Sequence, residues 1–260
     1  MRRFALLLVF LSGSPSRVSG QADAPRRPLD EVSSSVATIP ASVEAAMLEL
    51  SRLEAALRET PNAYPLLVAA SREAAALAVL PAFESNGAGL VTRSHAYAER
   101  ALMLLPDDVD ARFLRAAAMA LELDREGPVG KVHMAEEIWS ETDVILNADS
   151  LHAGAHHLRG RMHAGIMRLG AVTRFVALRM VGGDGLDGAS WDAAERHLHK
   201  AVELAPSNAM YQVELGVLYR DTGQHERARE VFDRAVDLEP GSPLDLYEIG
   251  RAQGFLAELR

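Results

Sequence analysis

Apolar residues recur at intervals of three and four along most of this chain. The runs 42–59 and 94–105 show the spacing clearly, and it places their apolar side chains on one face of an α-helix. No segment shows the strict alternation of a half-buried strand. We therefore predict an all-α fold that begins near residue 43.

The first 42 residues lack this periodicity and divide into two parts. Arg2 and Arg3 precede an apolar run over 4–11, and small residues follow up to Gly20. This layout is typical of a secretory signal peptide, and the run is too short for a membrane span, which needs roughly 20 residues. We predict a signal over 1–20, export to the periplasm or beyond, and a flexible Pro- and Ser-rich linker over 21–42, followed by a helical domain over 43–260.

Three helices end in similar sequences, at 98–106, 194–206 and 228–240. The interval from Pro206 to Pro240 is 34 residues, which is the period of a tetratricopeptide repeat. The last unit resembles this repeat, with Gln212 in place of a large aromatic residue. The matching positions are Leu215, Gly216, Tyr219, Ala228, Phe232, Ala235 and Pro240. The resemblance implies antiparallel helix pairs stacked as a right-handed solenoid.

Physical reasons support these residue types. Two helices approach closely only where a small side chain faces the partner, so we expect Gly216 and Ala228 at their crossing, with Tyr219 and Phe232 beside it. We expect a C-terminal capping helix over 246–259 and, because the spacing between Pro106 and Pro206 is irregular, inserted helices there. The stretch from Pro128 to Gly130 is interpreted as a connection.

A longer stretch resembles the regulator of microtubule dynamics family. The resemblance covers about 65–255 and rests mainly on the helix around His156-His157-Leu158-Arg159-Gly160-Arg161, an extra helix over Leu169–Met180, the Gly182-Gly183 loop and the helix start Ser190-Trp191-Asp192. It implies a helical adaptor that binds proteins and sometimes lipid. The chain differs from the eukaryotic members in lacking a membrane helix and in carrying an export signal, which indicates a bacterial exported member.

Histidines provide the main candidate chemistry. His152, His156 and His163 share one helical face, which suggests either a metal site or packing. His156 and His163 fall at the large packing positions of the repeat, so we favour packing and predict no metal or cofactor. We interpret the loop before Ser190 as a connection that ends in a helix cap at that serine.

Six residues are candidates for a partner groove on the concave side of the solenoid. His157 and Arg161 lie one helical turn apart and could together hold a carboxylate. In the last repeat the equivalent positions are apolar, and this stripe either lines a partner groove or packs on the extra helices. The predicted groove comprises His157, Arg161, Met210, Val213, Val217 and Arg220.

Composition narrows the function further. The formal charge is −9 with no run of more than two basic residues, which argues against nucleic-acid binding. The chain has no cysteine, which excludes disulfides and thiolate chemistry, and no recognisable catalytic constellation. We predict an exported scaffold, not an enzyme, that binds a protein or peptide. The alternative is a small-molecule, lipid or metal carrier with a central cavity around His156 and Arg161; the helical pattern leaves the oligomeric state open.

Overall fold

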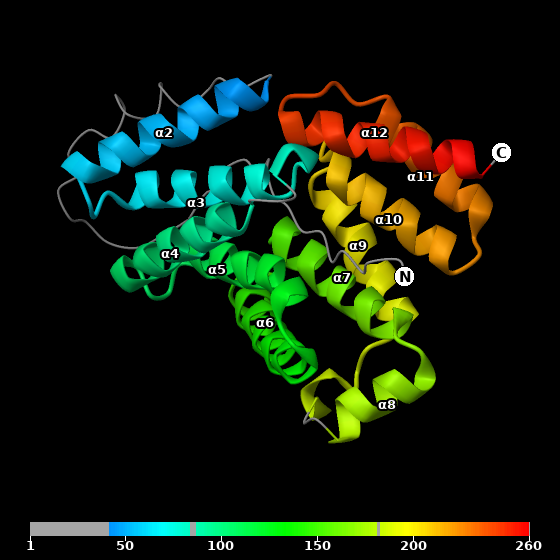
Figure 1. Cartoon of the computed structure of the whole chain (residues 1–260). Helices are drawn as coiled ribbons and strands as arrows, with labels where there is room; N and C mark the ends of the chain where they lie inside the picture. Colours follow the sequence, from blue (N-terminus) through cyan, green and yellow to red (C-terminus); the bar gives the residue numbers. More distant parts are fainter. Residues whose placement is uncertain (1–41, 84–86, 181–182, 260) are drawn as a thin grey trace.

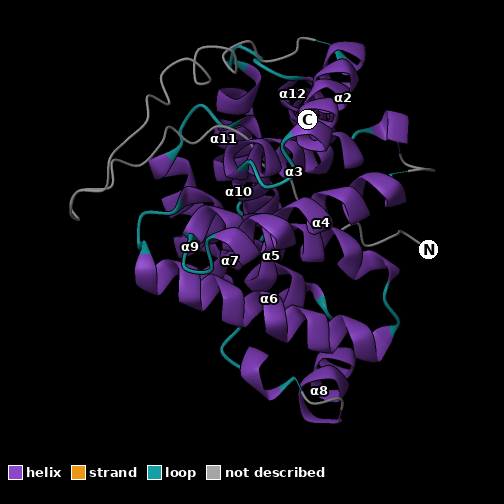
Figure 2. Cartoon of the chain, turned by 90° about the vertical axis from the view of Figure 1, so that its left-hand side faces the viewer, coloured by secondary structure: helices purple, strands orange, loops and turns teal. Residues whose placement is uncertain are grey.

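The computed structural model describes residues 42–83, 87–180 and 183–259. The expected signal peptide over 1–20 and nearly all of the expected linker lie outside these ranges and stay predictions, as does Gly182 of the glycine pair. Within the described ranges all regular structure is helical and no strand occurs (Figure 2).

The α-helices follow one another with short connections, some of which contain a 3₁₀ turn. Their bounds are α2 (Val43–Glu59), α3 (Tyr64–Ala78), α4 (Ala88–Leu104), α5 (Val109–Glu122), α6 (Pro128–Ala148), α7 (Ala153–Arg168), α8 (Ala171–Met180), α9 (Trp191–Leu204), α10 (Ala209–Asp221), α11 (His225–Val236) and α12 (Pro243–Glu258). The 3₁₀ turns are η1 (Pro81–Phe83), η2 (Leu123–Arg125) and η3 (Asp184–Leu186). None of the described helices combines the length and hydropathy that a membrane span requires.

Neighbouring helices pack in pairs along the chain. From α2 to α6 each helix packs against the next one in sequence, and α10 packs against α11 in the same way (Figure 1). In between, α7 packs extensively on α9 and bypasses α8, while α12 covers α10 and α11. The predicted all-α solenoid with an inserted helix and a C-terminal cap is confirmed.

Polar side chains fix where several helices begin. Asp108 accepts the backbone N–H of Ala111 at 2.9 Å at the start of α5, and Asn208 accepts that of Tyr211 at 3.1 Å at the start of α10. Ser190 accepts the N–H of Ala193 at 3.2 Å, as predicted for α9. Each cap satisfies a backbone donor that has no partner within its own helix.

Two glycines mark close helix crossings in the C-terminal half. A Cβ atom added to Gly216 would lie 2.5 Å from a ring carbon of Phe232, and one added to Gly160 would lie 2.6 Å from Leu198. These contacts join α10 to α11 and α7 to α9. The expectation that Gly216 faces its partner helix beside Phe232 is confirmed.

Two expectations, one about the Pro128–Gly130 stretch and one about the C-terminal helix, were wrong in detail. Pro128 begins α6, and Gly130 lies inside the same helix instead of in a connection. A proline at the first helical position is compatible with a helix because the N–H that it lacks would have no partner there. The extra length between Pro106 and Ser150 is therefore taken up largely by the 21 residues of α6, and the capping helix α12 begins at Pro243, ahead of residue 246.

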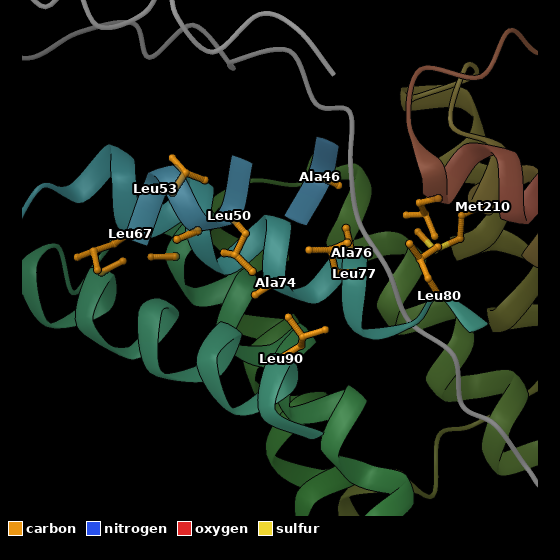
Figure 3. Close-up of a cluster of buried hydrophobic side chains, with 14 of the residues drawn as sticks. Ala46, Leu50, Leu53, Leu67, Ala74, Ala76, Leu77, Leu80, Leu90 and Met210 are labelled. Atoms are coloured by element: carbon orange, nitrogen blue, oxygen red, sulfur yellow. The ribbon is translucent and has the colours of Figure 1, made fainter. Parts of the chain in front are cut away.

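A hydrophobic cluster connects the first helices to the last ones. It contains side chains of α2, α3 and α4 together with Met210, Tyr211 and Leu244. Figure 3 shows Leu80, which follows α3, next to Met210 of α10. The solenoid therefore closes on itself, and this closure covers the first turn of α10.

The crossing at Gly216 gives a test of the helix register. We expect Gly216→Ala to lower the free energy of unfolding by about 1–3 kcal/mol, because the new methyl group would push Phe232 aside. Urea denaturation measures this change. Gly254→Ala in α12 is the matched control: no atom lies within 4 Å of its added Cβ, so alanine should leave stability unchanged or raise it by about 0.5–1 kcal/mol. Equal effects of the two substitutions would contradict the register.

Candidate functional site: the face of helices α7, α10 and α12

The predicted groove residues lie on two helices, and most are buried. His157 and Arg161 of α7 are 0% and 4% exposed. On α10 the side chain of Arg220 is 29% exposed, whereas the three apolar members are nearly inaccessible, namely Met210, Val213 and Val217. Five of the six therefore pack inside the protein in this state, and their role as a partner groove stays a prediction.

A network of buried charges crosses this face. Arg161 Nε of α7 lies 3.4 Å from Glu214 Oε2 of α10. Arg251 of α12 reaches the other oxygen of Glu214 at 3.3 Å and pairs with Glu248 at 2.7 Å. Both glutamates are at most 4% exposed. The four groups have a formal charge of zero and connect three helices that succeed one another across the face.

The two glutamates titrate differently. Burial alone would raise the pKa of Glu214, but the positive charges of Arg161 and Arg251 outweigh it and hold this pKa at about 2. Burial raises the pKa of Glu248 to about 7, although Arg251 opposes this shift. Glu214 therefore remains ionised at neutral pH, while Glu248 exchanges its proton near neutrality.

His157 does not act as a cation beside Arg161. Its ring stacks on Tyr211 with the ring centres 4.7 Å apart, and neither ring nitrogen has a hydrogen-bond partner among the described residues. Burial lowers the pKa of His157 to about 3, so the ring is neutral at neutral pH. Arg161 already faces Glu214 of the same chain, and the expected joint grip of His157 and Arg161 on a partner's carboxylate stays a prediction.

The histidine face predicted on α7 separates into two locations. His152 caps α7 by accepting the N–H of Ala155 at 3.0 Å, and its other ring nitrogen lies 3.4 Å from Asp110. His156 turns toward α9, where its Nδ1 lies 2.9 Å from Nδ1 of His197. His152 and His156 therefore have different partners.

His163 joins His156 and His197 in a compact cluster. The rings of His163 and His197 stack with their centres 5.7 Å apart. His156 Nε2 donates to the Ser150 carbonyl at 3.0 Å, so its Nδ1 accepts the hydrogen bond that His197 Nδ1–H donates. The described residues contain no group of three or more histidine or acidic side chains that could hold a metal.

Burial keeps this cluster neutral. It lowers the pKa of His197 to about 3 and that of His163 to about 4, in both cases with help from nearby cations such as Arg159. It also lowers the pKa of His156, although the Ser150 carbonyl opposes this shift. These rings act as packing groups between α7 and α9, as the repeat positions of His156 and His163 indicated.

Sequence reasoning missed His197, Glu214, Glu248 and Arg251. Glu214 carried a usable signal, since it is an acidic residue in the otherwise largely apolar first three turns of α10, and such a residue requires a partner if it is buried. Nothing local in the sequence identified Arg161 and Arg251 as those partners. The face as a whole contains charge pairs that neutralise one another and rings that stack on one another. These contacts hold the helices of this chain together.

A comparison with known proteins places this architecture in a family. The sequence profile described as "Regulator of microtubule dynamics protein 1-3" matches residues 44–258. The chain belongs to this family. The match spans the whole solenoid from α2 to α12, so the helical domain is the family's domain. A search of curated proteins found no match.

One solved structure shows the same fold. The thermophilic tetratricopeptide-repeat protein TTC0263 of Thermus thermophilus is similar, with a TM-score of 0.57, 18% identity, and coverage of 83% of this chain and 92% of that one. A MamA RS-1 double mutant matches with a TM-score of 0.40 and 18% identity over 80% of this chain and 86% of that one. The first likeness shows a tetratricopeptide-like fold.

The buried network predicts a large loss of stability when its central charge is removed. We expect Glu214→Gln to lower the free energy of unfolding by about 3–5 kcal/mol, because Arg161 and Arg251 would lose the carboxylate between them. Urea denaturation at neutral pH measures this loss. The control is Glu230→Gln on the exposed surface of α11, for which the change should stay within about 0.5 kcal/mol. A similar small change for Glu214→Gln would show that the network does not stabilise the fold.

The histidine cluster predicts a dependence of stability on pH. The folded pKa values of His163 and His197 lie below the usual value of 6.5. Their contribution to the free energy of unfolding is therefore complete above pH 6.5 and is lost as the pH falls toward 4. Between pH 8 and pH 5 the loss should be about 2 kcal/mol for each ring that stays neutral. The raised pKa of Glu248 has the opposite effect on stability, because its contribution is present at low pH and is lost as the pH rises through about 7.

A difference measurement separates these two effects. The stability of the wild type minus that of His197→Gln should decrease by about 2 kcal/mol from pH 8 to pH 5, since only the wild type has this titrating ring. The same difference for His199→Gln, on the exposed side of α9, should change much less. If the two differences change equally with pH, burial of the cluster has no role in the titration.

Proposed function

We propose that this protein is an exported helical-repeat scaffold that binds a segment of another protein on the face of α7, α10 and α12. The observation that carries the proposal is the architecture, in which paired helices stack so that α7, α10 and α12 present one continuous face. Successive repeats offer successive contacts to an extended partner, which is how solenoids form long binding surfaces.

Within this face, the accessible edge lies at the end of α10. Arg220 lies 4.4 Å above the ring of Phe255 and 3.6 Å from Glu258, both in α12. Its guanidinium remains partly exposed, so it can contact a partner without a rearrangement of the core. The five buried groove residues would hold this edge in place. Met210 packs in the cluster with α3, whereas Val213 and Val217 pack in the cluster of α7, α9, α11 and α12, so these residues would meet a partner only after a rearrangement of the core.

The alternative of a carrier with a central cavity has less support. His156 contacts His197 of α9, whereas Arg161 contacts Glu214 of α10. These different neighbours give the two side chains separate surroundings in place of one shared cavity. Export itself rests on the basic and apolar pattern over residues 1–20.

Site-specific photo-crosslinking tests this proposal in the source organism. A photoreactive residue at position 220 should capture a defined protein, because this position lies at the accessible edge of the face. The same residue at position 230, on the exposed surface of α11, is the matched control and should not capture that protein. Mass spectrometry identifies the adducts.

A separate measurement tests export. Sequencing of the exported chain should find a new N-terminus at Gln21.

Each result has a defined meaning. Capture at 220 and not at 230, from the exported fraction, would support the scaffold and its binding face. Equal capture at both positions, or none at 220, would overturn the proposed face. Retention of the protein in the cytoplasm with residues 1–20 intact would overturn export.

A further inference from the structure

Helices α2 and α4 border a cleft that the sequence did not reveal. Its volume is about 280 Å³, and it is lined by Glu54, Leu57, Arg58, Arg93, Tyr97 and Arg100. Both helices pack on α3, and consecutive helices reverse direction, so α2 and α4 run in the same direction (Figure 1). The cleft lies on helices other than α7, α10 and α12 and does not depend on the proposed partner face.

The charge of the cleft is opposite to that of the chain. Three arginines and one glutamate line it, whereas the whole chain has a formal charge of −9. Residues 93, 97 and 100 lie about one turn apart on α4, so their side chains share a face. This arrangement concentrates positive charge where an anionic group could enter.

The inner part of the cleft already binds a carboxylate of the chain itself. Arg93 Nη1 donates to Glu54 Oε1 at 2.8 Å, and the Tyr97 hydroxyl donates to the same oxygen at 3.0 Å. The cleft therefore holds a carboxylate that extends from α2 between an arginine and a tyrosine of α4. Charge-assisted hydrogen bonds of this kind are stronger than neutral ones.

The next turn of both helices repeats the arginines without a carboxylate. Arg58 follows Glu54 by one turn on α2, and Arg100 follows Tyr97 by about one turn on α4. Arg100 donates to the carbonyl of Pro61, which orients its guanidinium. Arg58 forms no ion pair with any acidic residue in the part of the chain that the structure describes. Two arginines thus face the cleft with no carboxylate to neutralise them.

We propose that the cleft between α2 and α4 binds an acidic peptide segment, with Arg58 and Arg100 holding one of its side-chain carboxylates. The incoming carboxylate occupies the turn beyond Glu54 and repeats the contact that Glu54 makes with Arg93. Arg93 remains paired with Glu54, so Arg58 and Arg100 are the cationic lining residues left for the incoming carboxylate. Acidic side chains on one side of an extended peptide recur every ~7 Å, so such a segment can offer a carboxylate to this turn in more than one register.

Binding of a fluorescent oligo-glutamate peptide tests this proposal. Fluorescence anisotropy at low ionic strength would give the dissociation constant for the wild type and for Arg58→Ala/Arg100→Ala. We expect the double variant to bind about tenfold more weakly, because it loses two surface ion pairs. Circular dichroism would check that the helical content and melting temperature are retained.

The control separates this site from general attraction. Arg52→Ala/Arg125→Ala removes the same charge from exposed arginines outside the lining and should bind like the wild type. A third variant, Arg58→Lys/Arg100→Lys, keeps the charge but not the guanidinium fork and should lose part of the affinity.

Three results would overturn the proposal. The first is no saturable binding of the peptide by the wild type. The second is an equal loss of affinity in the control, which would indicate attraction without a site. The third is inorganic phosphate that displaces the peptide at concentrations where chloride of equal ionic strength does not, which would assign the cleft to phosphate groups.

Discussion

The packing of the C-terminal half depends on the carboxylate of Glu214, which lies between Arg161 and Arg251. Transfer of these charges from water into the protein is unfavourable, and only their mutual arrangement offsets the cost. Apolar side chains tolerate some sliding of one helix along another, whereas an ion pair at 3.3–3.4 Å does not. The network therefore fixes how α7, α10 and α12 align. The apolar clusters around the network bury most of the side chains, but they restrict the alignment of the helices less than the ion pairs do.

A second constraint is the contact between the two ends of the solenoid. Leu80 after α3 meets Met210 in α10, as Figure 3 shows. An open solenoid would leave the first turn of α10 exposed, whereas here Met210 and Tyr211 are buried. Exposure of Met210 and Tyr211 is thus coupled to the packing of the N-terminal helices. Any process that uncovers these two side chains would require local opening of this contact.

Much of the fold could be predicted from local sequence because local rules determine it. The period of the apolar residues identified the helices, the close approach at Gly216 followed from the repeat pattern, and Ser190 was recognisable as a cap. Pro128 was misread because proline is compatible with both a turn and the first residue of a helix.

The candidate site was less predictable because its contacts are distant in sequence. His197 is 41 residues from His156, and Arg251 is 37 residues from Glu214. Neither separation has a periodic signature. The predicted groove positions lie on α7 and α10, but helical periodicity does not indicate whether another part of the chain covers them. That depends on the curvature of the whole solenoid.

The bypass of α8 has a consequence for how this fold can vary. The chain leaves the solenoid at Arg168 and returns at Trp191, while α7 and α9 stay packed against each other. In Figure 2 the helix α8 lies below α6, at the edge of the molecule. The excursion is anchored to α6 by η3, where Leu186 joins the hydrophobic cluster of α6. Because the free energy of closing a loop grows only slowly with its length, the parts of this excursion outside that anchor are where an insertion would disturb the repeat least.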